Sequence, residues 1–432
     1  MMWTRWFRTI LVCFTLLITI AVRGEVSNTS LTDAFDYYEV RRNLSPLIID
    51  SIDQGLRWLE IQQGPDGLFH GQVGITALVV AAFLKHPEQK YNLRTHPFLQ
   101  RSVSALTNYS NLDGSICDTS LLQMAHPSYT TSVCLLALAA TNSRNYYQQI
   151  RDGRTFLKSL QMVQIDRKDE DNSRYFGGIN YGIDQEANYD LSNLSLALLG
   201  LSETRNYMTK VMEQTFPDDS SFLSNAKEFI FNCQSNEVNE GSWGTNLGSN
   251  HYGGFVYSPN GESKTMITGK PYGSMTAAGL LSLMHVSTKN GRVRDAFEWI
   301  CNNWRLDKNP GMSKNQATKG LYYYYYNLAL ALAAYEEIRT IKKGQIIFGQ
   351  GQPKTFWFQE LAEALIKRKI VNSVVANQNI PDPANSNESI FYVGDRVDLA
   401  YWRNQNSFWM ERDTVLTTAY AILALEVIMS TE

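Results

Sequence analysis

The chain has 432 residues, of which 44% are hydrophobic, 19% charged and 12% aromatic. This composition is typical of a folded protein with a large core and excludes a globally disordered or fibrous chain. The formal net charge is -3 and the sequence has no long basic run, so nucleic acid is not expected as a partner.

The amino-terminal residues 1–24 have the pattern of a secretory signal peptide. Arg5 and Arg8 supply positive charge, residues 10–22 are apolar, and the segment ends on Gly24. We predict cleavage near Gly24, a secreted or periplasmic location, and no transmembrane span in the rest of the chain. An uncleaved amino-terminal anchor is the alternative. Residues 25–45 are expected to form an N-terminal extension and residues 46–432 one folded domain.

Six segments are apolar on every side and rich in Ala and Leu. A helix with this pattern is buried on all faces. Each of these segments also starts with small or polar residues. They cover residues 74–85, 129–141, 190–202, 272–284, 322–335 and 413–427.

Six amphipathic segments alternate with the apolar ones and predict outer helices with one wet face. Such pairs bury their apolar faces only by stacking on their neighbours. Because the terminal pairs are as apolar as the others, we predict an all-α fold, a single closed α/α toroid of six inner and six outer helices. An open helical solenoid is the alternative. The outer segments cover residues 46–62, 98–109, 147–163, 222–233, 293–304 and 356–371, and loops are expected over residues 344–355 and 377–395.

The joints between outer and inner helices combine a glutamine, a glycine turn and an aromatic residue. Examples are residues 62–70 and 234–245, and the last inner segment reads TTAYAILALE over residues 417–426. This pattern resembles the toroids of the terpenoid cyclase and protein prenyltransferase superfamily, especially the squalene-hopene cyclase branch, over residues 46–427. The resemblance implies a central cavity that binds an apolar isoprenoid-type ligand.

The chemistry of that family is only partly represented. Squalene-hopene cyclases protonate an alkene with a D-x-D-D acid, whereas here residues 187–190 keep only the last aspartate of that motif, Asp190. Asp190 and Asp413 are the candidate acids, although either could simply cap the helix that it precedes. Prenyltransferases bind zinc through Asp, Cys and His, but residues 320–326 contain neither Cys nor His, so no metal or other cofactor is expected.

The loops that precede the inner segments concentrate aromatic side chains. Aromatic faces stabilise carbocations, bind apolar chains and stack on sugars. The predicted cavity-lining residues are His126, Tyr129, Tyr189, His251, Tyr252, Tyr257, Tyr272, Tyr322, Tyr323, Trp402, Trp409 and Glu411.

Three functions follow from this sequence. The first is a secreted toroid that binds an apolar isoprenoid-type ligand and acts as a terpene cyclase through Asp190 or Asp413. The second is a non-catalytic toroid for protein or envelope contacts. The third is a carbohydrate-active enzyme, in which Asp190 pairs with Asp413 or Glu411, or in which His126 or His251 acts as a base.

Overall fold

A computed structural model of the protein consists of two compact units, Met1–Pro46 and Leu47–Glu432. The predicted signal peptide, residues 1–24, lies outside the described residues. Within the described residues, no helix has the length and hydropathy that crossing a membrane requires. The structure describes residues 28–120, 126–164, 173–183, 188–215, 218–286, 291–338, 345–347, 354–375, 380–382, 385–390, 396–406 and 408–431.

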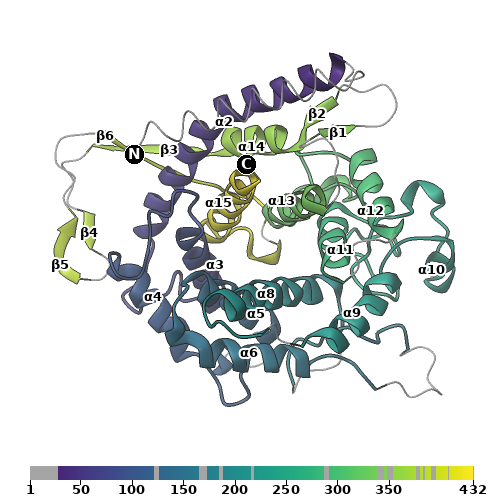
Figure 1. Ribbon diagram of the computed structural model, residues 1–432, viewed down its shortest axis with the longest axis horizontal. Coiled ribbons are helices and arrows are strands. Elements are labelled where there is room, and N and C mark those ends of the chain that lie inside the picture. The colour runs from purple at the N-terminus through teal and green to yellow at the C-terminus, as the bar shows by residue number, and fades with distance from the viewer. Residues whose placement is uncertain are drawn as a thin grey trace, which may run out of the picture. The chain divides into compact units, whose positions relative to one another are not determined.

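In the described part of the second unit, six apolar helices form a closed ring (Figure 1). Each helix contacts the next in chain order, and the last helix contacts the first, which closes the ring. The predicted single α/α toroid is therefore confirmed. The inner helices are α3 (Val73–Leu84), α5 (Pro127–Ala140), α8 (Leu191–Lys210), α11 (Gly273–Val286), α13 (Leu321–Ile338) and α15 (Thr414–Ser430).

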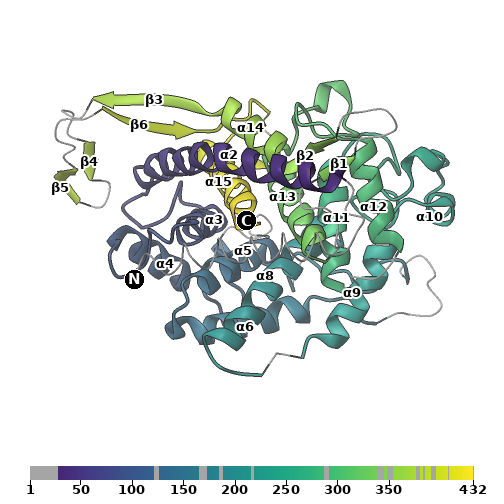
Figure 2. The ribbon, with the colours of Figure 1, turned by 45° about the horizontal axis from the view of Figure 1, so that its top comes forward.

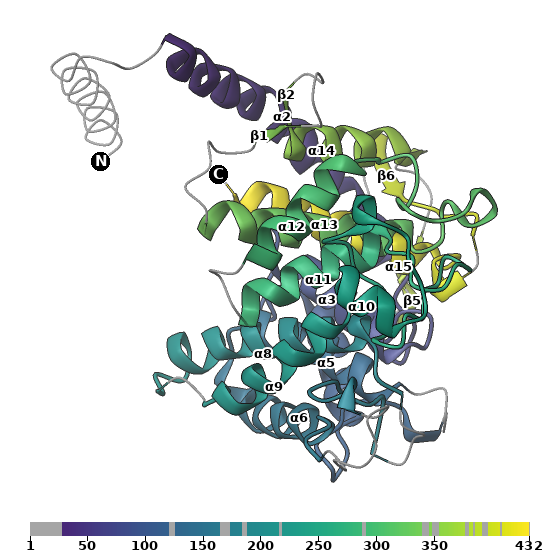
Figure 3. The same cartoon turned by 90° about the vertical axis from the view of Figure 1, so that its right-hand side faces the viewer.

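Amphipathic helices surround this ring (Figure 1), and Figure 3 shows the two layers from the side. On one of them, Phe98, Leu99, Val103 and Leu106 form a buried stripe at three- and four-residue spacing, which packs against an inner helix. The outer helices are α2 (Asn28–Glu60), of which residues from Leu47 onward belong to this unit, α4 (Pro97–Asn108), α6 (Tyr147–Ser159), α9 (Ser220–Asn232), α12 (Gly291–Asn302) and α14 (Trp357–Arg368).

Short strands occupy part of the chain between α14 and α15, where the sequence predicts helix and loop. The helix predicted over 356–371 ends at Arg368, and β3 (Ile370–Val375) pairs antiparallel with β6 (Arg396–Tyr401) as a projecting ribbon (Figure 2). Val374 opposes Val397 in this ribbon, and such β-branched residues favour strands. The other strands are β1 (Gln345–Ile347) with β2 (Lys354–Phe356), and β4 (Ile380–Asp382) with β5 (Asn385–Ile390). The short helices are α10 (Glu237–Ser242), η2 (Arg144–Tyr146), η3 (Ser249–His251), η4 (Lys314–Gln316) and η5 (Phe408–Met410).

Three of the joints that follow outer helices contain a glutamine whose side chain ties the turn to the next outer helix. In the first of them, Nε2 of Gln63 donates to the carbonyl oxygens of Gly67, at 3.3 Å, and of Phe98, at 2.8 Å. The side-chain amide thus bonds to a backbone carbonyl of the turn and to one of the next outer helix. The combination of glutamine and glycine therefore links consecutive outer helices of the ring. It recurs at Gln161 with Gly177 and Phe222, and at Gln234 with Gly253 and Arg292.

The glycine of such a joint is expected to be indispensable, and Gly177→Ala tests this. Gly177 has a φ of +84°, and a Cβ there would lie 1.8 Å from the carbonyl oxygen of Asn225 on α9. The left-handed backbone costs an L-residue about 1–2 kcal/mol, and the overlap adds about 1–3 kcal/mol.

Gly244→Ala is the matched control, because Gly244 has a φ of +72° and no atom within 4 Å of the added Cβ. We expect urea unfolding to show a loss of about 3 kcal/mol for Gly177→Ala and only about 1 kcal/mol for Gly244→Ala. Equal losses of unfolding free energy would show that the close approach of this glycine to α9 does not affect stability.

Candidate functional site

Neighbouring inner helices begin at the same end of the ring, which we call the mouth. Ser128 at the start of α5 bonds to Asn193 at the start of α8, at 2.6 Å, and the N–H of Leu191 donates to Tyr257 in the loop before α11. Hydrogen bonds also join the start of α11 to the loop before α13, the start of α13 to the loop before α15, and the loop before α15 to the loop before α3. The mouth therefore collects the loops that the sequence marks as rich in aromatic residues.

Asp190 is the centre of a hydrogen-bond network in the mouth. Its side chain is fully buried, and Oδ1 accepts from the N–H of Asn193 and from the hydroxyl of Ser192, each at 2.8 Å. Oδ2 accepts from the hydroxyls of Tyr181, at 2.5 Å, and Tyr257, at 2.6 Å. Four donors fill the acceptor positions of this carboxylate. Asp190 therefore caps α8 and holds two tyrosines in place.

Tyr129, Tyr181 and Tyr257 form a half-buried group that we call the tyrosine floor. The rings of Tyr129 and Tyr181 stack with centroids 5.5 Å apart, and the hydroxyl of Tyr129 bonds to that of Ser192. Burial, and then the charge of Asp190, raises the pKa of all three phenols. The floor therefore consists of protonated hydroxyls on aromatic rings, an arrangement suited to a polar ligand with apolar faces.

His70 and Asp413 form a pair that connects the first and last inner helices. Nδ1 of His70 lies 2.8 Å from Oδ2 of Asp413, while Oδ1 of Asp413 accepts from the N–H groups of Val415 and Leu416. The imidazole is 41% exposed, and His70 has a φ of +51° that L-residues rarely adopt. Because Nδ1 faces a carboxylate, it carries the proton, and Nε2 is the basic nitrogen. A carboxylate that orients a histidine in this way is typical of proton-transferring sites.

The turn that leads to Asp413 is an exposed apolar group, Phe408–Met410, which we call the aromatic turn. Its three side chains are 53%, 43% and 51% exposed. The ring of Trp409 lies against the start of α13, where a Cβ on Gly320 would be 2.8 Å from the indole. The ammonium of Lys319 lies 3.3 Å from the centroid of Phe408. The absence of a side chain on Gly320 therefore leaves room for the exposed indole of Trp409, which lies just before Asp413, the partner of His70.

Glu411 precedes α15 in the chain, and its buried carboxyl group lies against the start of α13. Its Oε1 accepts from the N–H of Tyr323 at 2.8 Å, and its Oε2 accepts from the amide of Asn404 at 2.6 Å. Burial raises the pKa of Glu411 to about 7, although these bonds oppose the shift. Glu411 therefore changes charge near neutral pH without direct contact with solvent.

This shift predicts a decrease in stability between pH 4.5 and 7. The unfolded chain ionises Glu411 near 4.5 and the folded chain near 7, so rising pH favours the unfolded state, by about 3 kcal/mol in total. Glu411→Gln should flatten this part of the profile of unfolding free energy against pH. Glu213→Gln is the control, because its side chain is 78% exposed. An unchanged profile in Glu411→Gln would contradict a pKa near 7.

The other predicted lining residues fall into two groups. Tyr272, Tyr322 and Trp402 are packed in the core at 0–2% exposure. The indole of Trp402 donates to the carbonyl oxygen of Leu365 at 2.8 Å. The rest are half-buried or exposed, namely His126, Tyr189, His251, Tyr252 and Tyr323. Three of them lie beside a further tyrosine: the ring centroid of His126 is 5.2 Å from that of Tyr181, that of Tyr189 is 5.9 Å from that of Tyr175, and that of Tyr323 is 6.0 Å from that of Tyr420. His251 belongs to η3 at the rim of the mouth, and Tyr252 follows it.

The sequence reasoning missed His70, Tyr181 and Phe408 as members of the mouth. A signal for His70 was nevertheless present. In a closed ring the residues before the first inner helix must lie beside those before the last one, which places His70 near Asp413.

The described residues contain neither a disulfide bond nor a cluster of metal-binding side chains. Cys117, Cys134, Cys233 and Cys301 are buried and unbridged. Among the described side chains, no group of three or more His, Cys, Asp or Glu is arranged to hold a metal ion.

The chain matches no protein-family model and no curated protein. It is similar to solved structures of the GH76A α-1,6-mannanase of Salegentibacter sp. HEL1_6. The enzyme by itself has 12% sequence identity and a TM-score of 0.46. Its inactive variants in complex with α-1,6-mannotriose and α-1,6-mannotetrose have 11% and 12% identity and TM-scores of 0.45 and 0.46. Each comparison covers 90% of this chain and 99% of the other.

These solved structures are glycoside hydrolases, whereas the sequence predicts a terpenoid cyclase or prenyltransferase relative with squalene-cyclase repeats. That prediction is wrong. The reason is physical, because the glutamines of the joints that suggested it tie together consecutive outer helices, so the pattern indicates the toroid and not a particular chemistry. Of the three functions that the sequence suggests, the carbohydrate-active enzyme is the one represented among these structures.

Proposed function

We propose that the protein is a carbohydrate-active enzyme that binds an oligosaccharide across the mouth. The observation that carries this proposal is the exposed imidazole of His70, held by Asp413, in the same mouth as the exposed indole of Trp409. A sugar ring offers C–H groups to an aromatic face and hydroxyls to polar side chains. A histidine with an available Nε2 can move the proton that breaking a glycosidic bond requires.

The chemical roles divide among the parts of the mouth. Asp413 keeps the proton of His70 on Nδ1, so that Nε2 can accept a proton from a substrate group or from an attacking water. The aromatic turn provides a stacking surface, and the tyrosine floor provides three rings, of which Asp190 holds the hydroxyls of Tyr181 and Tyr257 in place. Breakage of the bond by hydrolysis or by elimination is compatible with such a base.

A panel of neutral and acidic oligosaccharides tests the proposal. New reducing ends report both reactions, and ultraviolet absorbance of an unsaturated sugar reports elimination alone. We expect cleavage of at least one member of the panel and its loss in His70→Ala. If no oligosaccharide is bound or cleaved, the proposed function is wrong.

Trp409→Ala is expected to weaken oligosaccharide binding about tenfold, because loss of a stacking ring costs about 1 kcal/mol or slightly more. Titration calorimetry with the tightest-binding member of the panel measures the effect. Leu47→Ala, at an exposed position on the outer helix α2, is the control and should bind like the unmodified protein. Equal affinity of the Trp409 variant would remove the aromatic turn from the binding site.

A non-catalytic toroid for protein contacts is a second candidate function, favoured by the exposed apolar side chains of Phe408, Trp409 and Met410. This function predicts that Trp409→Ala abolishes capture of a protein partner while the oligosaccharide panel gives no signal. Both functions fit the secreted or periplasmic location that residues 1–24 predict, which mass spectrometry of the mature amino terminus would test.

A further inference from the structure

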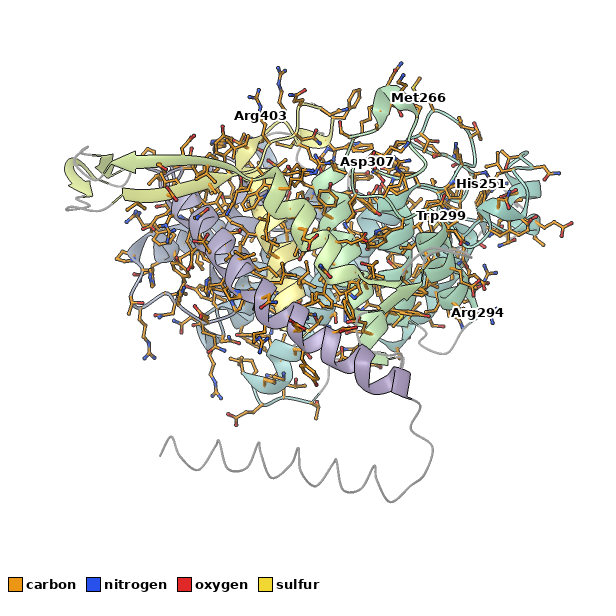
Figure 4. All side chains as sticks on the ribbon, turned by 90° about the horizontal axis from the view of Figure 1, so that it is seen from above. His251, Met266, Arg294, Trp299, Asp307 and Arg403 are labelled. Atoms are coloured by element: carbon orange, nitrogen blue, oxygen red, sulfur yellow. The ribbon has the colours of Figure 1, made fainter. Side chains whose placement is uncertain are left out.

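A cavity that we call the rim cavity lies at the rim of the mouth, between the end of α12 and the loop that precedes α11. It has a volume of about 480 Å³, within the range of small-molecule sites. Figure 4 labels two of its residues, His251 and Trp299. Pro271 lines the cavity and directly precedes Tyr272, so the cavity opens on the mouth side of α11.

The wall of this cavity is positively charged. Lys270, Arg305 and Lys308 line it, and no lining residue is an aspartate or glutamate. Arg305 is neutralised by Asp307, to which it donates two bonds of 2.9 and 2.8 Å. Among the described residues, Lys270 and Lys308 form no ion pair with a carboxylate, although the charges of Lys308 and Asp307 interact at longer range. Two positive charges of the wall therefore remain available to an anion.

The same wall contains aromatic and amide groups that a simple anion site would not need. Trp299 is 3% exposed, and its indole nitrogen has no acceptor among the described residues. The indole of Trp304 is fixed by a bond of 2.6 Å to Glu360. Two asparagines, Asn302 and Asn303, complete the polar wall. Rings beside amides are the groups that recognise a sugar.

His251 adds a neutral polar group to the cavity. Burial, and then the charge of Lys270, lowers the pKa of His251, while Glu240 opposes the shift. The imidazole is therefore neutral at physiological pH and can bond to a hydroxyl, while the two lysines supply the charge.

We propose that the rim cavity binds an acidic sugar, a pyranose ring that carries a carboxylate or sulfate group. The two lysines bind the acidic group, and the tryptophans, asparagines and His251 contact the ring. This inference rests on the proposed function and extends it, because it assigns an acidic saccharide as the substrate class and gives the enzyme a binding subsite outside the mouth.

Binding of matched disaccharides tests the inference. The probes are digalacturonate, monosulfated galactobiose, neutral galactobiose and inorganic sulfate, each titrated by calorimetry. We expect at least one of the two acidic disaccharides to bind at least tenfold more tightly than galactobiose. The variant K270A/K308A should lose this preference. K210A/K367A removes the same charge from exposed positions on α8 and α14 and should keep it.

The outcomes separate this inference from the proposed function. Equal binding of acidic and neutral disaccharides, or equal behaviour of the two double variants, contradicts the inference that the rim cavity binds an acidic sugar. Neither result contradicts cleavage at the mouth. Binding of inorganic sulfate without binding of either acidic disaccharide overturns the inference for the rim cavity, and the oligosaccharide panel then tests the proposed function separately. Acidic binding that depends on Lys270 and Lys308 but is accompanied by no cleavage of any oligosaccharide supports the rim cavity and contradicts the catalytic mouth. Thermal melting of each variant confirms that it is folded.

Discussion

Asp413→Asn is expected to lower turnover of the best oligosaccharide about a thousandfold, the typical contribution of a positioned general base. An asparagine can still cap α15 through its carbonyl oxygen, so the fold should be retained. Its amide group would then face Nδ1 of His70 and donate to it. This reverses the tautomer, places the proton on Nε2 and removes the base from the site.

Kinetics of single and double variants distinguish this role from a structural one. His70→Ala should lose as much activity as Asp413→Asn, and the double variant should lose little more, because the two residues act as one unit. Added imidazole should restore part of the activity of His70→Ala and none of that of Asp413→Asn. Near-normal turnover in Asp413→Asn would exclude the pair from the mechanism.

The helices could be predicted because their signal is local and long. A segment of 13 residues that is rich in Ala and Leu and apolar on every side, such as 272–284, favours a buried helix, and the structure has α11 over Gly273–Val286. The strands β3 and β6 could not be predicted, because each has six residues and their pairing joins segments separated by a long connection.

The site was harder to predict because its contacts join distant parts of the chain. The caps at Asp190 and Asp413 follow from their place directly before helices, and the structure shows both. The partners of these carboxylates do not follow from local sequence, since His70 and Asp413 are 343 residues apart. Only ring closure brings them together.

The substitution with the largest expected effect on stability is Asp219→Ala. The side chain of Asp219 is 2% exposed and accepts two bonds from Arg154, at 2.7 and 2.8 Å, while Lys158 and Arg205 lie within 3.3 Å. Arg154, itself 4% exposed, comes from α6, so this cluster ties α6, α8 and α9 together. Removal of the carboxylate leaves a buried guanidinium without its counter-charge, which costs about 3–5 kcal/mol.

The dependence of this loss on pH identifies its electrostatic origin. Burial alone would raise the pKa of Asp219, but the charge and hydrogen bonds of Arg154, together with Lys158, hold it below the ordinary value of 3.8. Because the pKa is lower in the folded state, the stabilisation is complete above pH 3.8 and is lost as the pH falls through the folded value. Urea unfolding at pH 7 should therefore show the full difference between Asp219→Ala and the unmodified protein, and the difference should shrink below pH 3.8.

Glu213→Ala removes the partner of Arg144 from an exposed pair and should change the free energy of unfolding by less than about 1 kcal/mol at either pH. A loss for Asp219→Ala that stays constant with pH would mean that packing, and not the ion pair, holds these three helices together.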